Sequence, residues 1–147
     1  MKIVMIDLSI AVRTTVLLVD DDFRQLSLLT LIMKMSGFSV AAANSPTEAI
    51  SLLNADGRKI DVAVIDYNMP VMNGCILAAY LKARYPEIKV VLYSGAFDIP
   101  VEERTSLDGF ISKSEGIDAL LYKIAEFGQL DLAEPAFESD VFLESVN

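Results

Sequence analysis

Residues 16–22 read VLLVDDD, an apolar run that changes within one step to three aspartates. A short run of β-branched residues and leucines that ends this abruptly is typical of a buried parallel strand opening into a loop. Strand character returns at 38–43, 60–65, 90–93 and 110–111, with helical segments in between. Five strands that alternate with helices predict an α/β fold, in which a parallel sheet is covered by helices on both faces.

The helical segments are bounded by residues that start and stop helices. Asp22 is the expected N-cap of a helix over 23–35, and Gly37 follows its end. Residues 45–48, Ser-Pro-Thr-Glu, form a capping box that starts a second helix, which ends near Gly57. Further helical segments are expected up to Tyr85, after Pro100 and over about 115–127.

Composition limits the classes of function. The chain has 147 residues, enough for one domain, and its net charge of −9 argues against direct contact with DNA or anionic membranes. It has no histidine, which excludes Ser-His-Asp triads and histidine-ligated zinc. The single Cys75 fits a reducing compartment. The apolar run 3–12 contains Asp7, makes a poor signal peptide and is too short to span a bilayer.

Polar side chains follow four of the predicted strands. They are Asp20 and Asp21, then Asp66, Ser94 and Lys113. Because the carboxyl ends of parallel strands share one edge of the sheet, these side chains should converge there. Clustered carboxylates raise one another's pKa unless a cation lies among them, and Mg²⁺ prefers oxygen ligands. The pattern therefore predicts a Mg²⁺ site, although each residue taken singly could be a cap, a turn residue or a surface charge.

Four short motifs carry a resemblance to a known family: VDD at 19–21, IDYNMP at 65–70 with Gly74, SGA at 94–96 and FISK at 110–113. From about Val16 to Phe127 the chain resembles the receiver domain of two-component response regulators. The resemblance implies a flavodoxin-like, doubly wound (βα)5 sheet with strand order 2-1-3-4-5. It also implies a receiver domain over 15–127, preceded by an extension over 1–14 and followed by an acidic tail over 128–147.

The resemblance implies a phosphoryl-accepting site. In the family, the aspartate matching Asp66 accepts a phosphoryl group from a phosphohistidine. The residue matching Asp21 binds Mg²⁺ directly, the one matching Asp20 helps through water, and the backbone carbonyl at Asn68 completes the protein ligands together with Asp66.

Three further residues receive roles from the same resemblance. Lys113 and Mg²⁺ would neutralise the charge on the transferred phosphoryl group. Ser94 would donate a hydrogen bond to a phosphoryl oxygen, and Phe110 would be the switch aromatic that follows the Ser94 loop inward.

The function implied is a single-domain, phosphorylation-activated switch rather than a metabolic enzyme. Its expected partners are a sensor histidine kinase or histidine phosphotransfer protein and an unidentified protein target, without DNA or membrane binding, and with a homodimer left open. Its expected location is the cytoplasm. One alternative is a phosphohydrolase of the haloacid-dehalogenase kind, but that class needs an acid where Asn68 stands. Another is a degenerate receiver used as a binding scaffold, which would lack Asp66, Lys113 or the acidic pair.

Two departures from the family pattern produce expectations of their own. Ser114 stands where receivers usually have proline, and a cis bond before a non-proline residue costs about 2.5–4 kcal/mol, so a trans peptide is predicted. The stretch from Ser94 to Lys113 is shorter than the corresponding stretch in the family. The difference is about one helical turn, or roughly four residues. The fourth helix of the fold should therefore be short or irregular.

The first helix has more apolar residues than one face can bury. In the family register Leu28, Leu29, Ile32 and Met33 would face the sheet. That register leaves Leu31 and Met35 on one flank and Leu26 on the other. We expect the surplus to be covered by the apolar residues of the tail, or by a second subunit. The tail residues concerned are Leu130, Leu132, Phe137, Val141 and Phe142.

Overall fold

A five-stranded parallel sheet forms the centre of the molecule. The computed structural model describes residues 13–55, 59–96 and 99–130. The strand order is β2-β1-β3-β4-β5, and every pairing is parallel, as the sequence analysis predicts. The strands are β1 (Thr15–Val19), β2 (Ser39–Ala43), β3 (Val62–Ile65), β4 (Lys89–Ser94) and β5 (Gly109–Ser112).

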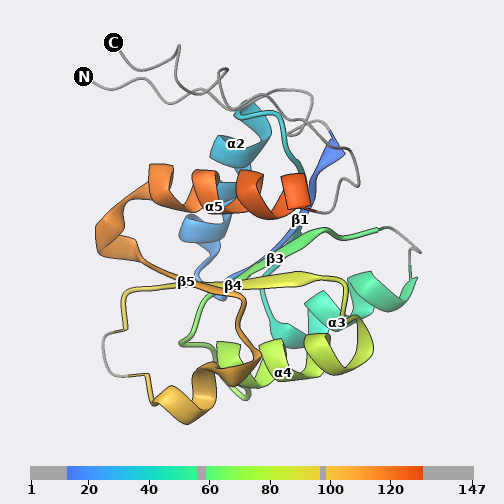
Figure 1. Cartoon of the computed structure of the whole chain (residues 1–147), viewed down its shortest axis with the longest axis vertical. Coiled ribbons are helices and arrows are strands. Elements are labelled where there is room, and N and C mark those ends of the chain that lie inside the picture. The colour runs from blue at the N-terminus through green and yellow to red at the C-terminus, as the bar shows by residue number, and fades with distance from the viewer. Residues whose placement is uncertain (1–12, 56–58, 97–98, 131–147) are drawn as a thin grey trace.

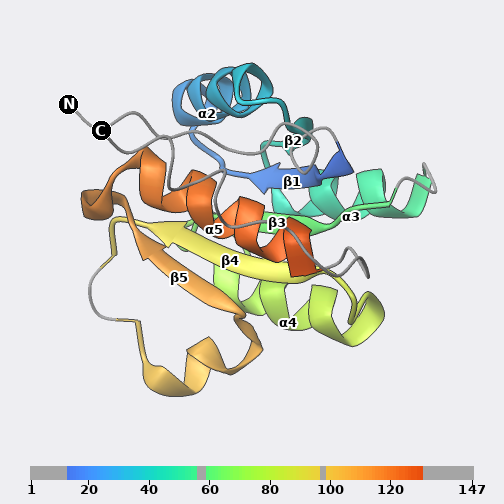
Figure 2. The same cartoon turned by 45° about the horizontal axis from the view of Figure 1, so that its top comes forward.

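Helices cover both faces of this sheet. Helices α2 and α5 lie side by side on one face, and α3 and α4 lie on the other (Figures 1 and 2). The α-helices are α2 (Phe23–Met35), α3 (Pro46–Ala55), α4 (Gly74–Arg84) and α5 (Ile117–Leu130). Two short 3₁₀ helices, η1 (Val101–Ser106) and η2 (Lys113–Glu115), flank β5 in the sequence. No helix in the three described ranges is both long and apolar enough to cross a bilayer.

Alternate residues of the central strands fill two separate cores. In β1, Val16 and Leu18 pack with the residues of α2 and α5, whereas Leu17 and Val19 pack with those of α3 and α4. All four side chains are at most 1% exposed. A strand that is buried on both faces needs a continuous apolar run, which explains why VLLV shows no polar alternation.

The predicted caps bound the helices as expected. The Asp22 carboxylate accepts the backbone N–H groups of Arg24 and Gln25, at 3.0 and 3.3 Å. The Ser45 hydroxyl accepts the N–H of Glu48 at 3.0 Å, at the start of α3. These bonds satisfy N–H groups that have no partner within the helix.

The predicted orientation of α2 is wrong at two positions. Leu26, expected on a flank, is only 6% exposed, whereas Leu28, expected to face the sheet, is 55% exposed. The buried stripe is Leu26, Leu29 and Met33, the i, i+3, i+7 spacing of a helix face. Leu28 follows Leu26 by two residues, about 200° of rotation, so both cannot face the sheet. Leu31 and Met35 lie off the buried stripe, as predicted, and both side chains are exposed.

The two departures from the family pattern have the expected consequences. The described ranges contain no cis peptide bond, so the Lys113–Ser114 peptide is trans. The segment between β4 and β5 contains the six-residue 3₁₀ helix η1 in place of an α-helix. At the end of the chain, α5 continues past Phe127 to Leu130. The predicted packing of the tail beyond Leu130, like the extension over 1–12, lies outside the described residues.

Candidate phosphoryl-transfer site

Three carboxylates meet at the carboxyl edge of the sheet. One oxygen from each of Asp20, Asp21 and Asp66 lies within 4.8 Å of the other two. Backbone bonds continue the strand pairing into this cluster: the Asp20 N–H donates to Ala43 at 3.2 Å, and the Asp66 N–H donates to Val19 at 3.0 Å. The sheet itself therefore holds two of the carboxylates in place.

Lys113 brings a positive charge to the same edge from the end of β5. Its ammonium lies 3.6 Å from Asp66 and 3.8 Å from Asp20. It also lies 5.8 Å from the centre of the Tyr93 ring, which is within the range of a cation–π contact. Four of the residues predicted to converge, Asp20, Asp21, Asp66 and Lys113, are thus brought together.

The electrostatics of the cluster favour binding of another cation. Burial raises the pKa of Asp20. The hydrogen bond that the Asp20 carboxylate accepts from the N–H of Asp22, at 2.9 Å, and the charge of Lys113 both lower this pKa, but burial has the larger effect. Burial also raises the pKa of Asp66, against the charge of Lys113, while Asp20 adds to the rise. One ammonium therefore does not compensate three carboxylates. The oxygen donors fit a hard divalent ion such as Mg²⁺ better than zinc.

Two other predicted residues, Asn68 and Ser94, lie at or just beyond the carboxyl ends of neighbouring strands, β3 and β4. Asn68 is exposed, two residues after Asp66 in the loop between β3 and α4. Ser94, at the end of β4, is fully buried, and its hydroxyl oxygen accepts the N–H of Ala96 at 3.1 Å. A hydroxyl can accept and donate hydrogen bonds at the same time, so the Ser94 O–H can still donate to another acceptor.

Phe110 lies in β5 and is joined to η1 by an aromatic contact. It pairs with Leu92 of β4, and the guanidinium of Arg104 lies 5.3 Å from the centre of its ring. The Arg104 side chain also donates to the carbonyl of Ile99 at 3.1 Å. Arg104 therefore connects η1 to the ring expected to act as the switch.

A second link between η1 and the site has no counterpart in the sequence analysis. The hydroxyl of Tyr67 donates to the Glu103 carboxylate at 2.8 Å, and this bond raises the pKa of Tyr67. Tyr67 directly follows Asp66, so the bond ties η1 to the neighbour of the central carboxylate. A tyrosine and a glutamate 36 residues apart have no periodicity that would pair them, and no sequence signal could have identified them.

Close packing holds the loop that follows Asp66. The N–H of Gly74 donates to the carbonyl of Tyr67 at 2.8 Å. A Cβ at Gly74 would overlap with the carbonyl of Asp66 and lie 2.9 Å from Leu92. Only glycine fits at this position without moving the backbone of Asp66.

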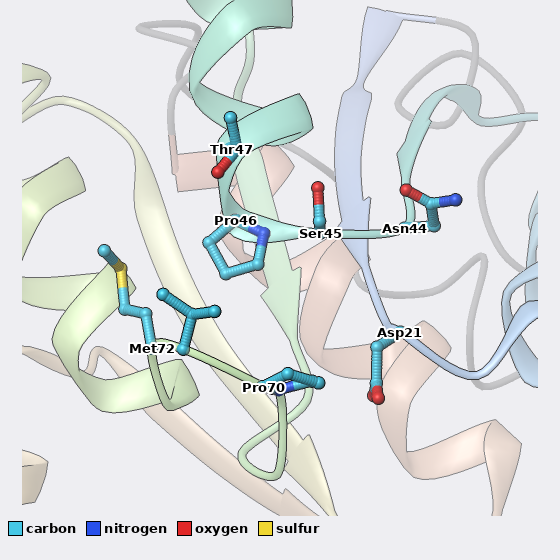
Figure 3. Close-up of a pocket in the computed structure, with 8 residues that line it drawn as sticks. Asp21, Asn44, Ser45, Pro46, Thr47, Pro70 and Met72 are labelled. Atoms are coloured by element: carbon cyan, nitrogen blue, oxygen red, sulfur yellow. The ribbon is translucent and has the colours of Figure 1, made fainter.

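A small hollow borders the cluster on the side of Asp21. It has a volume of about 160 Å³ and lies between the loop at 44–47 and the loop at 70–72 (Figure 3). Val71, on its rim, is fully exposed and has φ +73°, a left-handed conformation that is unfavourable for a β-branched residue. Of the three carboxylates, only that of Asp21 lines this hollow.

Comparison with known proteins identifies a family. The model of the response regulator receiver domain matches residues 16–125. A curated relative, the C4-dicarboxylate transport transcriptional regulatory protein DctD of Rhizobium meliloti, is 33% identical over 110 residues. That match covers 73% of this chain but 24% of DctD, so the chain corresponds to about a quarter of that relative.

Solved structures have the same fold. The receiver domain of the Francisella response regulator 1452 is 25% identical, with a TM-score of 0.72 over 80% of this chain and 98% of that one. TrrA in complex with the histidine kinase ThkA has a TM-score of 0.70 at 21% identity, over 78% of this chain and 97% of that one. TrrA of Thermotoga maritima has also been solved with Mg²⁺-BeF, at a TM-score of 0.69 and 21% identity over 78% and 98% of the two chains.

Proposed function

Because the chain belongs to the response regulator receiver domain family, we propose that it is a phosphorylation-activated switch of a two-component system, with Asp66 as its phosphoacceptor. The observation that carries this proposal is the placement of Asp66 among Asp20, Asp21 and the Lys113 ammonium. Chemistry at this site serves signalling rather than metabolism. The proposed domain is 15–127, with 1–14 and 128–147 as its extensions.

Asp66 would act as the nucleophile. Its carboxylate oxygen forms a bond to phosphorus while the bond from phosphorus to the donor's histidine nitrogen breaks, and that nitrogen keeps the electron pair. The transition state carries its charge on the three equatorial oxygens, so the site needs positioning and positive charge. The Lys113 ammonium, 3.6 Å from Asp66, supplies that charge on one side.

Mg²⁺ would supply the charge on the other side, held by Asp21 and Asp66 with the backbone carbonyl of Asn68, and by Asp20 through water. The raised pKa values of Asp20 and Asp66 support this assignment, since a dication lowers the cost of keeping buried carboxylates ionised. Lys113 is not a ligand in this arrangement.

The response would pass from Asp66 to η1 and β5. Ser94 can donate its hydroxyl proton to a phosphoryl oxygen, which would shift the loop at 94–96. Phe110 and its contact with Arg104 would follow that shift. The surface formed by η1 and β5 would thereby differ between the two states for a protein target.

The proposed phosphodonor is a sensor histidine kinase or a histidine phosphotransfer protein. TrrA, a protein of the same fold, has been solved in complex with a histidine kinase, which supports this assignment. The net charge of −9 argues against direct binding of DNA and of anionic membranes. The proposed location is the cytoplasm, and the protein could act as a monomer or as a homodimer.

Mass spectrometry of the protein treated with Mg²⁺ and acetyl phosphate tests the assignment of Asp66. We expect one added phosphoryl group, lost in Asp66→Asn and lost again when EDTA removes the metal. Asp118→Asn, at an exposed aspartate in α5, is the control and should be labelled like the wild type. Equal labelling of Asp66→Asn, or labelling that EDTA does not reduce, would overturn the mechanism.

A further inference from the structure

The outer face of α2 is apolar and positively charged. Four large apolar side chains of this helix are exposed: Phe23 (70%), Leu28 (55%), Leu31 (56%) and Met35 (78%). Arg24 and Lys34 are exposed on the same helix, which has no acidic residue between its first and last positions. Asp22, the N-cap before Phe23, is the nearest acidic residue at the first end of the helix. An exposed apolar stripe of this size is typical of a surface that is covered by another segment.

A groove runs along one flank of this face. Its volume is about 470 Å³, and Leu31 and Lys34 of α2 lie opposite Ala42 of β2 and Glu48 of α3. Phe23, the first residue of α2, also lines it. Because Leu31 and Phe23 belong both to the groove and to the exposed apolar residues, the two form one continuous surface.

The chain leaves α5 close to the end of this surface. Gly128 packs so tightly on Thr14 that an added Cβ would overlap with the threonine side chain. The carbonyl of Thr14 accepts the N–H of Ser39 at 3.1 Å, just beyond the end of α2. Helices α2 and α5 therefore end at the same side of the sheet, as Figure 2 shows.

The 17 residues after Leu130 are long enough to follow α2 from end to end. A 13-residue helix is about 20 Å long. Seventeen residues span roughly 25 Å as a helix and up to about 56 Å when fully extended. The segment is therefore longer than α2 in either conformation.

The composition of this segment complements α2. It has five acidic residues and no basic one, together with large apolar residues that include Phe137, Val141 and Phe142. A second copy of α2 would instead bring Arg24 and Lys34 against Arg24 and Lys34, which is a repulsion between like charges. Charge thus favours the chain's own acidic tail over a second copy as the occupant.

We propose that residues 131–147 bind along the outer face of α2, with their apolar side chains on Leu31 and Met35 and their carboxylates near Lys34 and Arg24. The bound tail covers the groove between α2, β2 and α3. This binding needs neither Mg²⁺ nor a phosphoryl group, so its test is independent of the phosphorylation experiment.

A spin label on the tail tests the proposal in the full chain. Ser139→Cys provides the attachment site, and the wild type is the control for labelling, because its Cys75 is buried. We expect the label to broaden the backbone amide signals of residues 23–35. The amides of α4, on the other face of the sheet, should stay sharp.

A pair of matched substitutions identifies the contact. Leu31→Gln should weaken the binding of the tail roughly tenfold, equivalent to about 1.4 kcal/mol, and reduce the broadening accordingly. Ile76→Gln changes a side chain of similar exposure, 53% against 56%, on the opposite face and should leave the broadening unchanged.

Three results would overturn the proposal. The first is an α2 spectrum that the label does not affect. The second is broadening that persists in Leu31→Gln, because binding would then not use this face. The third result comes from a mixture of spin-labelled protein with an isotope-enriched copy that carries no label. Broadening of the α2 signals of that copy would show that the tail binds to a second molecule.

Discussion

Replacing Lys113 with methionine should destabilise the metal-free protein at neutral pH. Methionine keeps most of the apolar stem but removes the ammonium that lies 3.6 Å from Asp66 and 3.8 Å from Asp20. Asp20, Asp21 and Asp66 would then share one edge of the sheet without this cation. The pKa of Asp20 and that of Asp66, already raised by burial, should rise further.

The magnitude follows from the geometry of the two ion pairs. At an effective dielectric constant near 20, attractions over 3.6 and 3.8 Å are about 4.6 and 4.4 kcal/mol. These gross values are reduced because the substitution also removes the cost of partly burying the lysine, whose side chain is 28% exposed. Removing one partner lowers the free energy of unfolding by about 3–5 kcal/mol for a buried ion pair and by about 0–1 kcal/mol for an exposed pair. Because Lys113 is partly buried, we expect Lys113→Met to lower the free energy of unfolding by an intermediate amount, about 2 kcal/mol.

The effect should depend on pH with a definite sign. Asp20 and Asp66 have raised pKa values in the folded protein relative to an ordinary value of 3.8. Such groups reduce stability above their folded pKa and cease to do so once they are protonated. The destabilisation by Lys113→Met should therefore be largest at neutral pH and shrink as the pH falls toward about 4. Mg²⁺ at neutral pH should restore most of the loss.

Urea denaturation at both pH values, with and without Mg²⁺, measures these differences. Lys123→Met is a matched control, because it removes a 3.6 Å ion pair with Glu126 and a cation over the Phe127 ring. Glu126 is 59% exposed, so this pair should contribute less than about 1 kcal/mol. A loss in Lys113→Met that is no larger than in the control, or that does not change with pH, would refute the electrostatic reasoning.

Three other predictions concern the loop after Asp66. Tyr67→Phe removes the hydrogen bond to Glu103 and should lower the free energy of unfolding by about 1 kcal/mol. Amide hydrogen exchange in η1 should become faster, and unchanged exchange would show that this bond does not hold η1 in place. Gly74→Ala should cost about 1–3 kcal/mol, since the new methyl group overlaps with the carbonyl of Asp66, and an unchanged thermal midpoint would contradict this packing. Val71→Gly should raise the midpoint by relieving about 1 kcal/mol of left-handed strain, and calorimetry showing a lower midpoint would mean that the strain is outweighed by chain entropy.

The sequence by itself determined the type and succession of the elements and the residues of the acidic cluster. These features are local: an apolar run that ends in aspartate is a buried strand followed by a loop, whatever surrounds it. Since all the strands are parallel, residues that follow them must meet at one edge, so Asp20, Asp66 and Lys113 could be grouped before any distance was known. The order 2-1-3-4-5 came from the family motifs, because alternation alone does not say which strands are neighbours.

Only the tertiary structure decided how α2 is rotated and how η1 is attached. Leu26 and Leu28 are equally apolar, and the choice between them depends on which stripe fits the sheet and α5, a contact made by residues distant in sequence. The Tyr67–Glu103 bond likewise exists because the chain brings η1 back to the end of β3. Local patterns record the preferences of a segment, whereas packing between segments selects one rotation and one partner among several that are locally equivalent.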